Sequence, residues 1–207
     1  RTPLGRVGWR ATMPILGSGL RRGRDDLNQT RERLGLAPLE RFHGGISELL
    51  AVVATFPQLE YPRRWPANVR VSGPLFFELE GEDTAVPEGE EPLVVIAPST
   101  SQDPECRLLR VALEALADEP VRVLATTNRH RPEEPVEVPA NAVLVPWMRY
   151  SHAFPAADVV ICHGGHGTVA GALAGGAPPL VWPAVGDQGG NGARVAWSGA
   201  GLSLPRR

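Results

Sequence analysis

Six short apolar runs recur at regular intervals in the C-terminal part of the chain and limit the folds that it can adopt. They are Leu93–Ala97, Val121–Ala125, Ala142–Val145, Val159–Cys162, Leu180–Trp182 and Leu202–Leu204. Helical or connecting segments separate them. Nearly continuous apolar strands that alternate with helices form parallel sheets covered on both faces. The sequence therefore predicts a doubly wound, Rossmann-like α/β domain in this region.

The segment after the first of these runs carries the signals of a helix start. Asp103 is a residue type that caps helices, and Pro104 favours the first helical position. Leu109, Leu113 and Leu116 follow at a spacing that places them on one helix face. We therefore expect a helix that begins directly after Asp103.

An acidic segment, residues 78–91, separates this region from the rest of the chain. It holds seven acidic residues, two glycines, one proline and no basic residue, a composition that does not fold by itself. Upstream, the runs Ala51–Phe56 and Val69–Ser72 indicate two further strands. We therefore predict the C-terminal part of one α/β domain in residues 1–77, an interdomain linker in 78–91 and a second domain in 92–207.

The first 38 residues hold eight arginines against three acids. Apolar residues recur there at helical spacing, at Trp9, Met13, Leu16 and Leu20, and a second helix is expected over 25–34, ended by Gly35. We interpret the pair as surface helices with a solvated basic face. The alternative is weak attachment to an anionic membrane surface.

Composition restricts the remaining classes. A formal charge of −2 and a pI near 6.2 argue against a general nucleic-acid-binding protein. No apolar run reaches the roughly 18 residues that a membrane-spanning helix needs. Only Cys106 and Cys162 are present, which is too few for a disulfide framework and favours the cytoplasm. We interpret Cys162, at the end of a buried run, as an inert core thiol.

The sequence HGGHGT, residues 163–168, joins an apolar strand to a helix of small residues. Such a turn leaves backbone N–H groups directed outward at a helix N-terminus, where the helix dipole favours an anion such as phosphate. Other strands end in Ser99–Ser101, which offers hydroxyl groups, in Trp147, which offers a flat ring, and in Asp187-Gln188, a polar pair. Because ligands bind beyond the carboxyl ends of parallel strands, we expect a ligand with phosphates, a ring and a polyol, which is a nucleotide sugar.

The combination of HGGHGT with Pro146-Trp147 ahead of it and GDQ at 186–188 resembles the donor-binding signature of family 1 glycosyltransferases of the GT-B fold. The bacterial macrolide and natural-product enzymes are the most similar group. The resemblance implies a Rossmann-like donor domain in 92–207 and the C-terminal part of a Rossmann-like acceptor domain in 1–77. It also implies inverting, metal-independent transfer of a hexose from a UDP- or TDP-sugar to a hydroxyl group of a small lipophilic acceptor. The nucleotide sugar is then a co-substrate, and no cofactor is expected.

The resemblance assigns roles to individual residues. It implies diphosphate binding by Thr100, His163, Gly165, Gly167 and Thr168, base binding by Trp147 and the backbone of Met148, and sugar binding by Asp187 and Gln188. Helix amides and a histidine can stabilise the charge on a departing diphosphate, which agrees with the first of these assignments. We interpret Trp182, inside an apolar run, as a core residue.

Three positions depart from the family pattern. Arg149-Tyr150 stands where many members have Pro-Gln, Gly171 where a ribose-binding glutamate is common, and Ser99 where a glycine is usual. The departures leave the identity of the nucleotide and of the sugar open.

The family's catalytic base is a histidine near the beginning of the acceptor domain, which we expect upstream of Arg1, so the chain is expected to be a fragment of an enzyme. His43 is interpreted as a loop residue. His166 is either a donor contact or a solvent-facing residue at a helix start. The alternative function is a non-catalytic nucleotide-sugar-binding protein.

Overall fold

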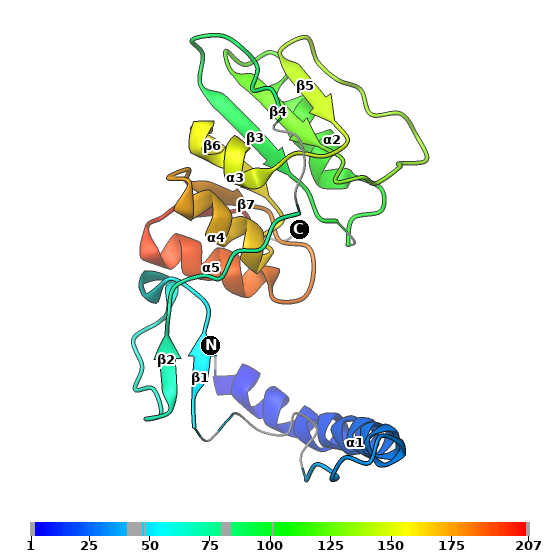
Figure 1. Cartoon of the computed structure of the whole chain (residues 1–207). Helices are drawn as coiled ribbons and strands as arrows, with labels where there is room; N and C mark the ends of the chain where they lie inside the picture. Colours follow the sequence, from blue (N-terminus) through cyan, green and yellow to red (C-terminus); the bar gives the residue numbers. More distant parts are fainter. Residues whose placement is uncertain (1–2, 41–46, 48, 80–83, 101, 206–207) are drawn as a thin grey trace. The chain divides into compact units, whose positions relative to one another are not determined.

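The computed structural model of the chain describes residues 3–40, 47, 49–79, 84–100 and 102–205 (Figure 1). His43, Ser101 and residues 80–83 of the acidic segment lie outside the described residues. The chain forms two compact units, one of Arg1–Ala51 with Trp65–Arg70 and the other of Val52–Arg64 with Val71–Arg207. The domain boundaries predicted around residues 78–91 stay a prediction.

In the described residues of the first unit, one long helix, α1, runs over Pro3–Arg33. The prediction of two helices was wrong, because the helix continues through Pro14, which removes one N–H donor but has a backbone angle that a helix accepts. The predicted end at Gly35 is confirmed. Gly35 has a left-handed φ of 68°, and the Leu36 amide donates to the Arg31 carbonyl at 2.9 Å, as in a Schellman motif.

The described side chains of the predicted apolar stripe on α1 are partly exposed, at 47% for Met13 and 46% for Leu20. Membrane-surface attachment of this helix stays a prediction. None of the helices in the described part of the chain is both long enough and apolar enough to cross a bilayer.

Two short strands, β1 (Ala51–Val53) and β2 (Val69–Val71), pair in a two-stranded sheet. Both predicted strands in this region are therefore present, in shortened form. A 3₁₀ turn, η1 (Pro57–Leu59), lies between them in the chain and buries Leu59.

The second unit is built on a six-stranded sheet in which every pair of neighbouring strands is parallel. Its strands are β3 (Leu93–Ala97), β4 (Arg122–Thr126), β5 (Ala142–Val145), β6 (Val159–Cys162), β7 (Pro179–Val181) and β8 (Leu202–Ser203), in the spatial order β5-β4-β3-β6-β7-β8. The predicted doubly wound α/β domain is confirmed. The strand order reverses between β3 and β6, which is where such sheets bind ligands.

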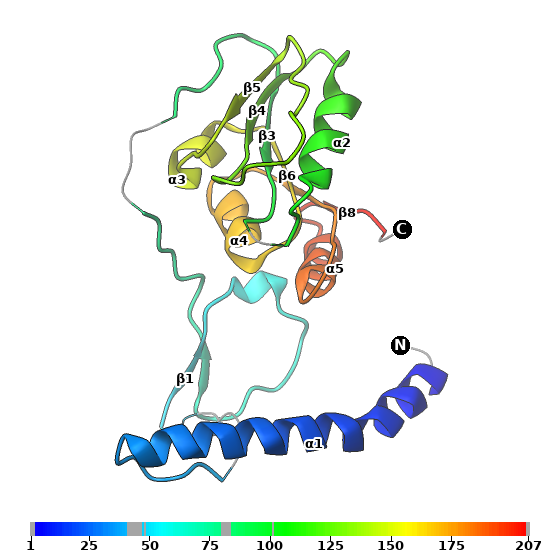
Figure 2. The ribbon, with the colours of Figure 1, turned by 90° about the vertical axis from the view of Figure 1, so that its right-hand side faces the viewer.

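Helices cover both faces of this sheet (Figure 2). On one face lies α2 (Arg107–Leu116), whose buried leucines pack with Ile96 and Val123. On the other lie α3 (Tyr150–Ala153), the 3₁₀ turn η2 (Phe154–Ala156) and α4 (His166–Ala174), which pack with Leu93 and Val95, and α5 (Gln188–Ser198) contributes Val195 to the same core cluster. The continuous apolar runs follow from this double covering.

The start of α2 differs from the prediction. The helix begins at Arg107, after Cys106 in a left-handed conformation with a φ of 52°. Asp103 still caps it, because its carboxylate accepts hydrogen bonds from the Arg107 and Leu108 amides at 2.9 and 3.0 Å. Pro104 therefore lies in the turn before the helix and not at its first position.

The acidic segment belongs to the second unit, and its described residues bond to the rest of that unit. The Glu78 carboxylate accepts hydrogen bonds from the Tyr150 amide at 2.6 Å and from the amide and hydroxyl of Ser151. Arg122 donates to the carbonyls of Glu91 and Pro87. The segment is thus attached to this unit at both of its ends.

Candidate functional site

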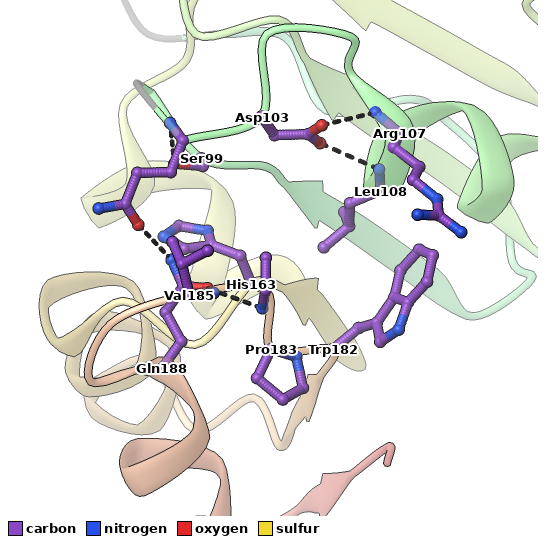
Figure 3. Close-up of a pocket in the computed structure, with 11 residues that line it drawn as sticks. Ser99, Asp103, Arg107, Leu108, His163, Trp182, Pro183, Val185 and Gln188 are labelled. Atoms are coloured by element: carbon purple, nitrogen blue, oxygen red, sulfur yellow. Dashed lines mark hydrogen bonds between the residues drawn. The ribbon is translucent and has the colours of Figure 1, made fainter. Parts of the chain in front are cut away.

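A cavity of about 230 Å³ lies beyond the carboxyl ends of β3, β6 and β7, beside the reversal of strand order (Figure 3). It is lined by Ser99, Gln102, Asp103, Arg107, Leu108, His163, Trp182, Pro183, Ala184, Val185 and Gln188. In Figure 3, Ser99, His163 and Gln188 gather on one side, and Arg107 and Trp182 lie on the other. Hydrogen-bonding groups thus face a cation and an indole ring.

The glycine-rich turn brings the end of β6 to the start of α4. Gly164 has a left-handed φ of 89°, and Gly165 is the extended residue before the helix. The first helical hydrogen bond runs from the Val169 amide to the Gly165 carbonyl at 3.0 Å. The amides between these two residues therefore precede the helical bonding pattern and are available to an anion.

His163 lies against this turn. A Cβ atom added at Gly165 would come within 2.6 Å of the Nε2 atom of His163, so the absence of a side chain there lets the imidazole approach the start of α4. The Nδ1 atom is buried, and none of the described residues gives it a hydrogen bond of normal geometry. The histidine thus places its Nε2 atom at the candidate anion site.

Burial lowers the pKa of the His163 imidazole below its ordinary value, while the Ala97 carbonyl and the carboxylates of Asp103 and Asp187 act in the opposite direction. Desolvation disfavours the charged form, so the ring is neutral at neutral pH before a ligand binds. A bound phosphate would reverse this balance by supplying a negative charge.

The other residues predicted to contact the diphosphate surround the start of α4. Gly167 and Thr168 line a second cavity of about 490 Å³ together with Tyr150, Ser151 and Gly171. Thr100 is exposed just beyond the end of β3. The helix start therefore lies between His163, which faces the first cavity, and Thr168, which faces the second.

The residues predicted to bind the base differ in accessibility. Met148 is only 1% exposed and its side chain belongs to the core. Trp147 is half-buried, and its Nε1 atom is buried without a hydrogen-bond partner among the described residues. The guanidinium carbon of Arg129 lies 4.6 Å from the centroid of the Trp147 ring. One face of the predicted base platform thus carries a cation.

The side chains of Asp187 and Gln188 lie in different surroundings. Gln188 is 2% exposed, and its Oε1 atom accepts hydrogen bonds from the Ala184 and Val185 amides at 2.8 and 2.9 Å. Its Nε2 atom donates to Gln102 at 2.6 Å. Its amide group thus organises the loop after β7 and fastens it to the loop after β3.

Asp187 is exposed and lines a third cavity of about 470 Å³, together with His166 and Asn191. Asn191 donates to its Oδ2 atom at 3.0 Å. His166 Nε2 lies 2.8 Å from the Ala54 carbonyl, so it contacts a neighbouring segment of the same unit. Of the two sugar-binding residues predicted together, only Asp187 has its side chain at this cavity.

Sequence reasoning missed the wall of the first cavity formed by Arg107 and Trp182. Trp182 packs against the core, as predicted, but it also lines the cavity, and the guanidinium carbon of Arg107 lies 5.7 Å from its ring centroid. The predicted strand extended through Trp182, whereas β7 ends at Val181. The place of Trp182 next to a proline at a strand end was the available signal.

Cys162 is buried at the end of β6, and burial raises the pKa of its thiol to about 12. It is protonated at neutral pH, which agrees with its interpretation as an inert core residue. In the part of the chain that the structure describes, no three His, Cys, Asp or Glu side chains cluster in a way that suits a metal ion.

Comparison with known proteins relates the chain to glycosyltransferases. Residues 110–207 match the family profile described as the C-terminal domain of erythromycin biosynthesis protein CIII-like proteins. The chain is 34% identical over 189 residues to 4'-demethylrebeccamycin synthase of Lentzea aerocolonigenes, covering 86% of this chain and 44% of that protein. It is 32% identical over 187 residues to a PGL/p-HBAD biosynthesis glycosyltransferase of Mycobacterium tuberculosis, covering 86% and 42%. The chain thus spans less than half the length of these curated relatives.

Solved structures show the same fold. The spinosyn forosaminyltransferase SpnP has a TM-score of 0.65 at 19% identity, covering 87% of this chain and 47% of that one. The glycosyltransferase VinC, solved in complex with DTDP, has a TM-score of 0.62 at 24% identity, covering 87% and 45%. The fold class predicted from the sequence, the C-terminal part of a GT-B structure, is confirmed, and so is the predicted resemblance.

Proposed function

Because this chain is a relative of the natural-product glycosyltransferases, we propose that the protein transfers a hexose from a UDP- or TDP-sugar to a hydroxyl group of a small lipophilic acceptor. One observation carries the proposal, which is that His163 and the start of α4 meet at the reversal of strand order. A nucleoside diphosphate needs such a site, with amide donors and a nitrogen donor directed at one anion.

In this proposal the described residues act on the leaving group. The amides at the start of α4 and the imidazole of His163 stabilise the negative charge that develops on the diphosphate as its bond to the sugar breaks. Thr168 contacts the same group from the side of the second cavity. Transfer is inverting and proceeds without a metal cofactor. The acceptor hydroxyl is deprotonated by a base that we place in the part of the enzyme upstream of Arg1.

We also place the protein in the cytoplasm. Cys106 and Cys162 are both free and buried, which suits a reducing compartment.

The proposal is tested by calorimetric titration of the chain with UDP and TDP, with uridine and thymidine as matched controls that lack the diphosphate. We expect each diphosphate to bind at least about tenfold more tightly than its nucleoside, because charge-assisted hydrogen bonds to the phosphates contribute most of the binding free energy. Equal affinity for UDP and uridine would exclude a diphosphate site. Binding of neither would exclude a donor domain.

A second prediction separates the two polar residues at the start of α5. Asp187→Ala should weaken binding of a UDP-hexose by about 10- to 100-fold relative to UDP, because the carboxylate is accessible to sugar hydroxyls. Gln188→Ala should instead lower the free energy of unfolding by about 1–3 kcal/mol, because it leaves the Ala184 and Val185 amides unpaired.

The measurements are calorimetry with UDP and a UDP-hexose, and urea unfolding, on both variants. A Gln188→Ala variant as stable as the wild type would show that its hydrogen bonds do not hold the loop. If Asp187→Ala leaves the ratio of UDP-hexose affinity to UDP affinity unchanged, Asp187 does not bind the sugar.

A further inference from the structure

A left-handed turn at the carboxyl end of β4 holds Arg129 against the predicted base platform. Asn128 and Arg129 have φ values of 52° and 63°. Asparagine tolerates this region, but arginine rarely adopts it, and such conformations persist only where surrounding contacts impose them. Contacts with the rest of the unit must therefore hold this turn in place.

Hydrogen bonds to the ends of three neighbouring strands hold the turn. Asn128 is 7% exposed, and its Nδ2 atom donates to the Pro98 carbonyl after β3 at 2.7 Å. The backbone amide of Asn128 donates to Thr126 Oγ1 at 3.0 Å. The Arg129 amide donates to the Pro146 carbonyl after β5 at 2.6 Å. The turn is thus attached to the ends of β3, β4 and β5.

Tyr150 completes the attachment. Its hydroxyl group accepts a hydrogen bond from Asn128 Nδ2 at 2.9 Å and donates to Asn128 Oδ1 at 3.1 Å. Burial raises the pKa of the Tyr150 hydroxyl, so it keeps the proton that this double contact requires. The ring is itself fixed by stacking on Phe154, with the centroids 4.5 Å apart. Together with the contacts to the three strand ends, Tyr150 therefore holds the turn, and with it Arg129, in position.

The result is an exposed guanidinium group 4.6 Å above the Trp147 ring. A guanidinium is planar and stacks on aromatic rings on either of its faces. Because the Arg129 side chain is exposed, its guanidinium group can also contact a second planar group. The buried Nε1 atom of Trp147 lies away from solvent, so the indole ring serves as a backing and not as a hydrogen-bond donor.

We infer that the nucleobase of the donor stacks on the Arg129 guanidinium, which Trp147 supports from behind, and that Tyr150 is the positioning residue for this contact. The inference rests on the proposed function and assigns the surface on which the base of a nucleoside diphosphate lies. Bases stack on arginine as they do on aromatic rings, so the contact adds affinity for any planar base.

The test compares Arg129→Ala, Arg129→Lys and Tyr150→Phe, with Arg131→Ala as the matched control for loss of an exposed arginine from the same loop. Affinities for UDP and for inorganic pyrophosphate, which has no base, are measured by calorimetry. We expect Arg129→Ala to weaken UDP binding by about 5- to 50-fold and to leave pyrophosphate binding within about twofold. Arg129→Lys should not restore UDP binding, because an ammonium group cannot stack.

Tyr150→Phe keeps the aromatic ring and removes the hydroxyl group, so it should weaken UDP binding by less than Arg129→Ala does, again without an effect on pyrophosphate. Arg131→Ala should change neither affinity. Equal losses for UDP and pyrophosphate in Arg129→Ala would show that Arg129 acts only as a charge. Unchanged or tighter UDP binding would overturn the inference by showing that Arg129 blocks the indole. Failure of the wild type to bind UDP would overturn the proposed function as well.

Discussion

Replacing Gly164 with alanine is expected to lower the free energy of unfolding by about 2–5 kcal/mol. The residue has a left-handed φ of 89°, which strains any side chain. Its new Cβ atom would lie 2.6 Å from Cγ1 of Val181 and 3.1 Å from the Gln188 carbonyl oxygen. Val181 is fully buried in β7, so its side chain cannot turn toward solvent to avoid the new atom. Urea unfolding followed by circular dichroism measures the loss.

Gly189→Ala is the matched control, because a Cβ atom there would meet nothing within 4 Å and the residue lies in α5. It should leave stability unchanged or raise it by up to about 1 kcal/mol, since alanine favours a helix over glycine. An unfolding midpoint of Gly164→Ala equal to that of the wild type would mean that β7 is more adaptable than its packing implies. The same variant should also weaken UDP binding, because the turn sets the position of His163.

The apolar runs predicted the strands well because helices cover both faces of the sheet. Leu93–Ala97 and Val159–Cys162 are strands with the predicted bounds. Burial on both faces leaves no polar alternation, so the apolar run and the strand coincide. The turn at Gly164 was also predictable, since only glycine adopts its backbone angle without strain.

The start of α2 was not predictable from local signals. Sequence reasoning places a capping residue immediately before its helix, whereas Asp103 reaches the Arg107 and Leu108 amides across a turn that ends at the left-handed Cys106. Nothing in the residue types indicates that three residues intervene. The helix was therefore expected too early, although its cap was identified correctly.

The arrangement of the candidate site depends on contacts between loops that are distant in the sequence. Asp187 and Gln188 are adjacent, which suggested a shared ligand, but successive side chains at a helix start point about 100° apart. Gln188 turns inward to Gln102, 86 residues away, and Asp187 turns outward to Asn191. Likewise, the cation–π contact between Arg129 and Trp147 arises because β4 and β5 end side by side.

His163→Ala is expected to weaken binding of UDP or TDP by about 1–3 kcal/mol, or about 5- to 150-fold, which is the contribution of a hydrogen bond to a charged phosphate. The Nε2 atom of the imidazole lies beside Gly165 at the start of α4, and no described carboxylate forms a hydrogen bond with the buried Nδ1 atom. Calorimetry on the variant measures the loss. His152→Ala, which removes an exposed histidine outside the cavities described above, is the control and should bind as the wild type does.

The loss should also depend on pH, in a direction fixed by the lowered pKa of His163. In the absence of ligand, burial keeps the ring neutral, and a bound diphosphate raises its pKa by stabilising the charged form. Between these two pKa values the complex holds a proton that the unliganded protein lacks, so phosphate binding strengthens as the pH falls through this window. The ratio of wild-type to His163→Ala affinity should therefore increase from pH 8 to pH 6. Because the nucleotide titrates in the same way with both proteins, its own protonation cancels in this ratio. A ratio that is constant over this range would show that His163 meets the phosphate as a neutral donor, and a ratio of one would remove it from the site.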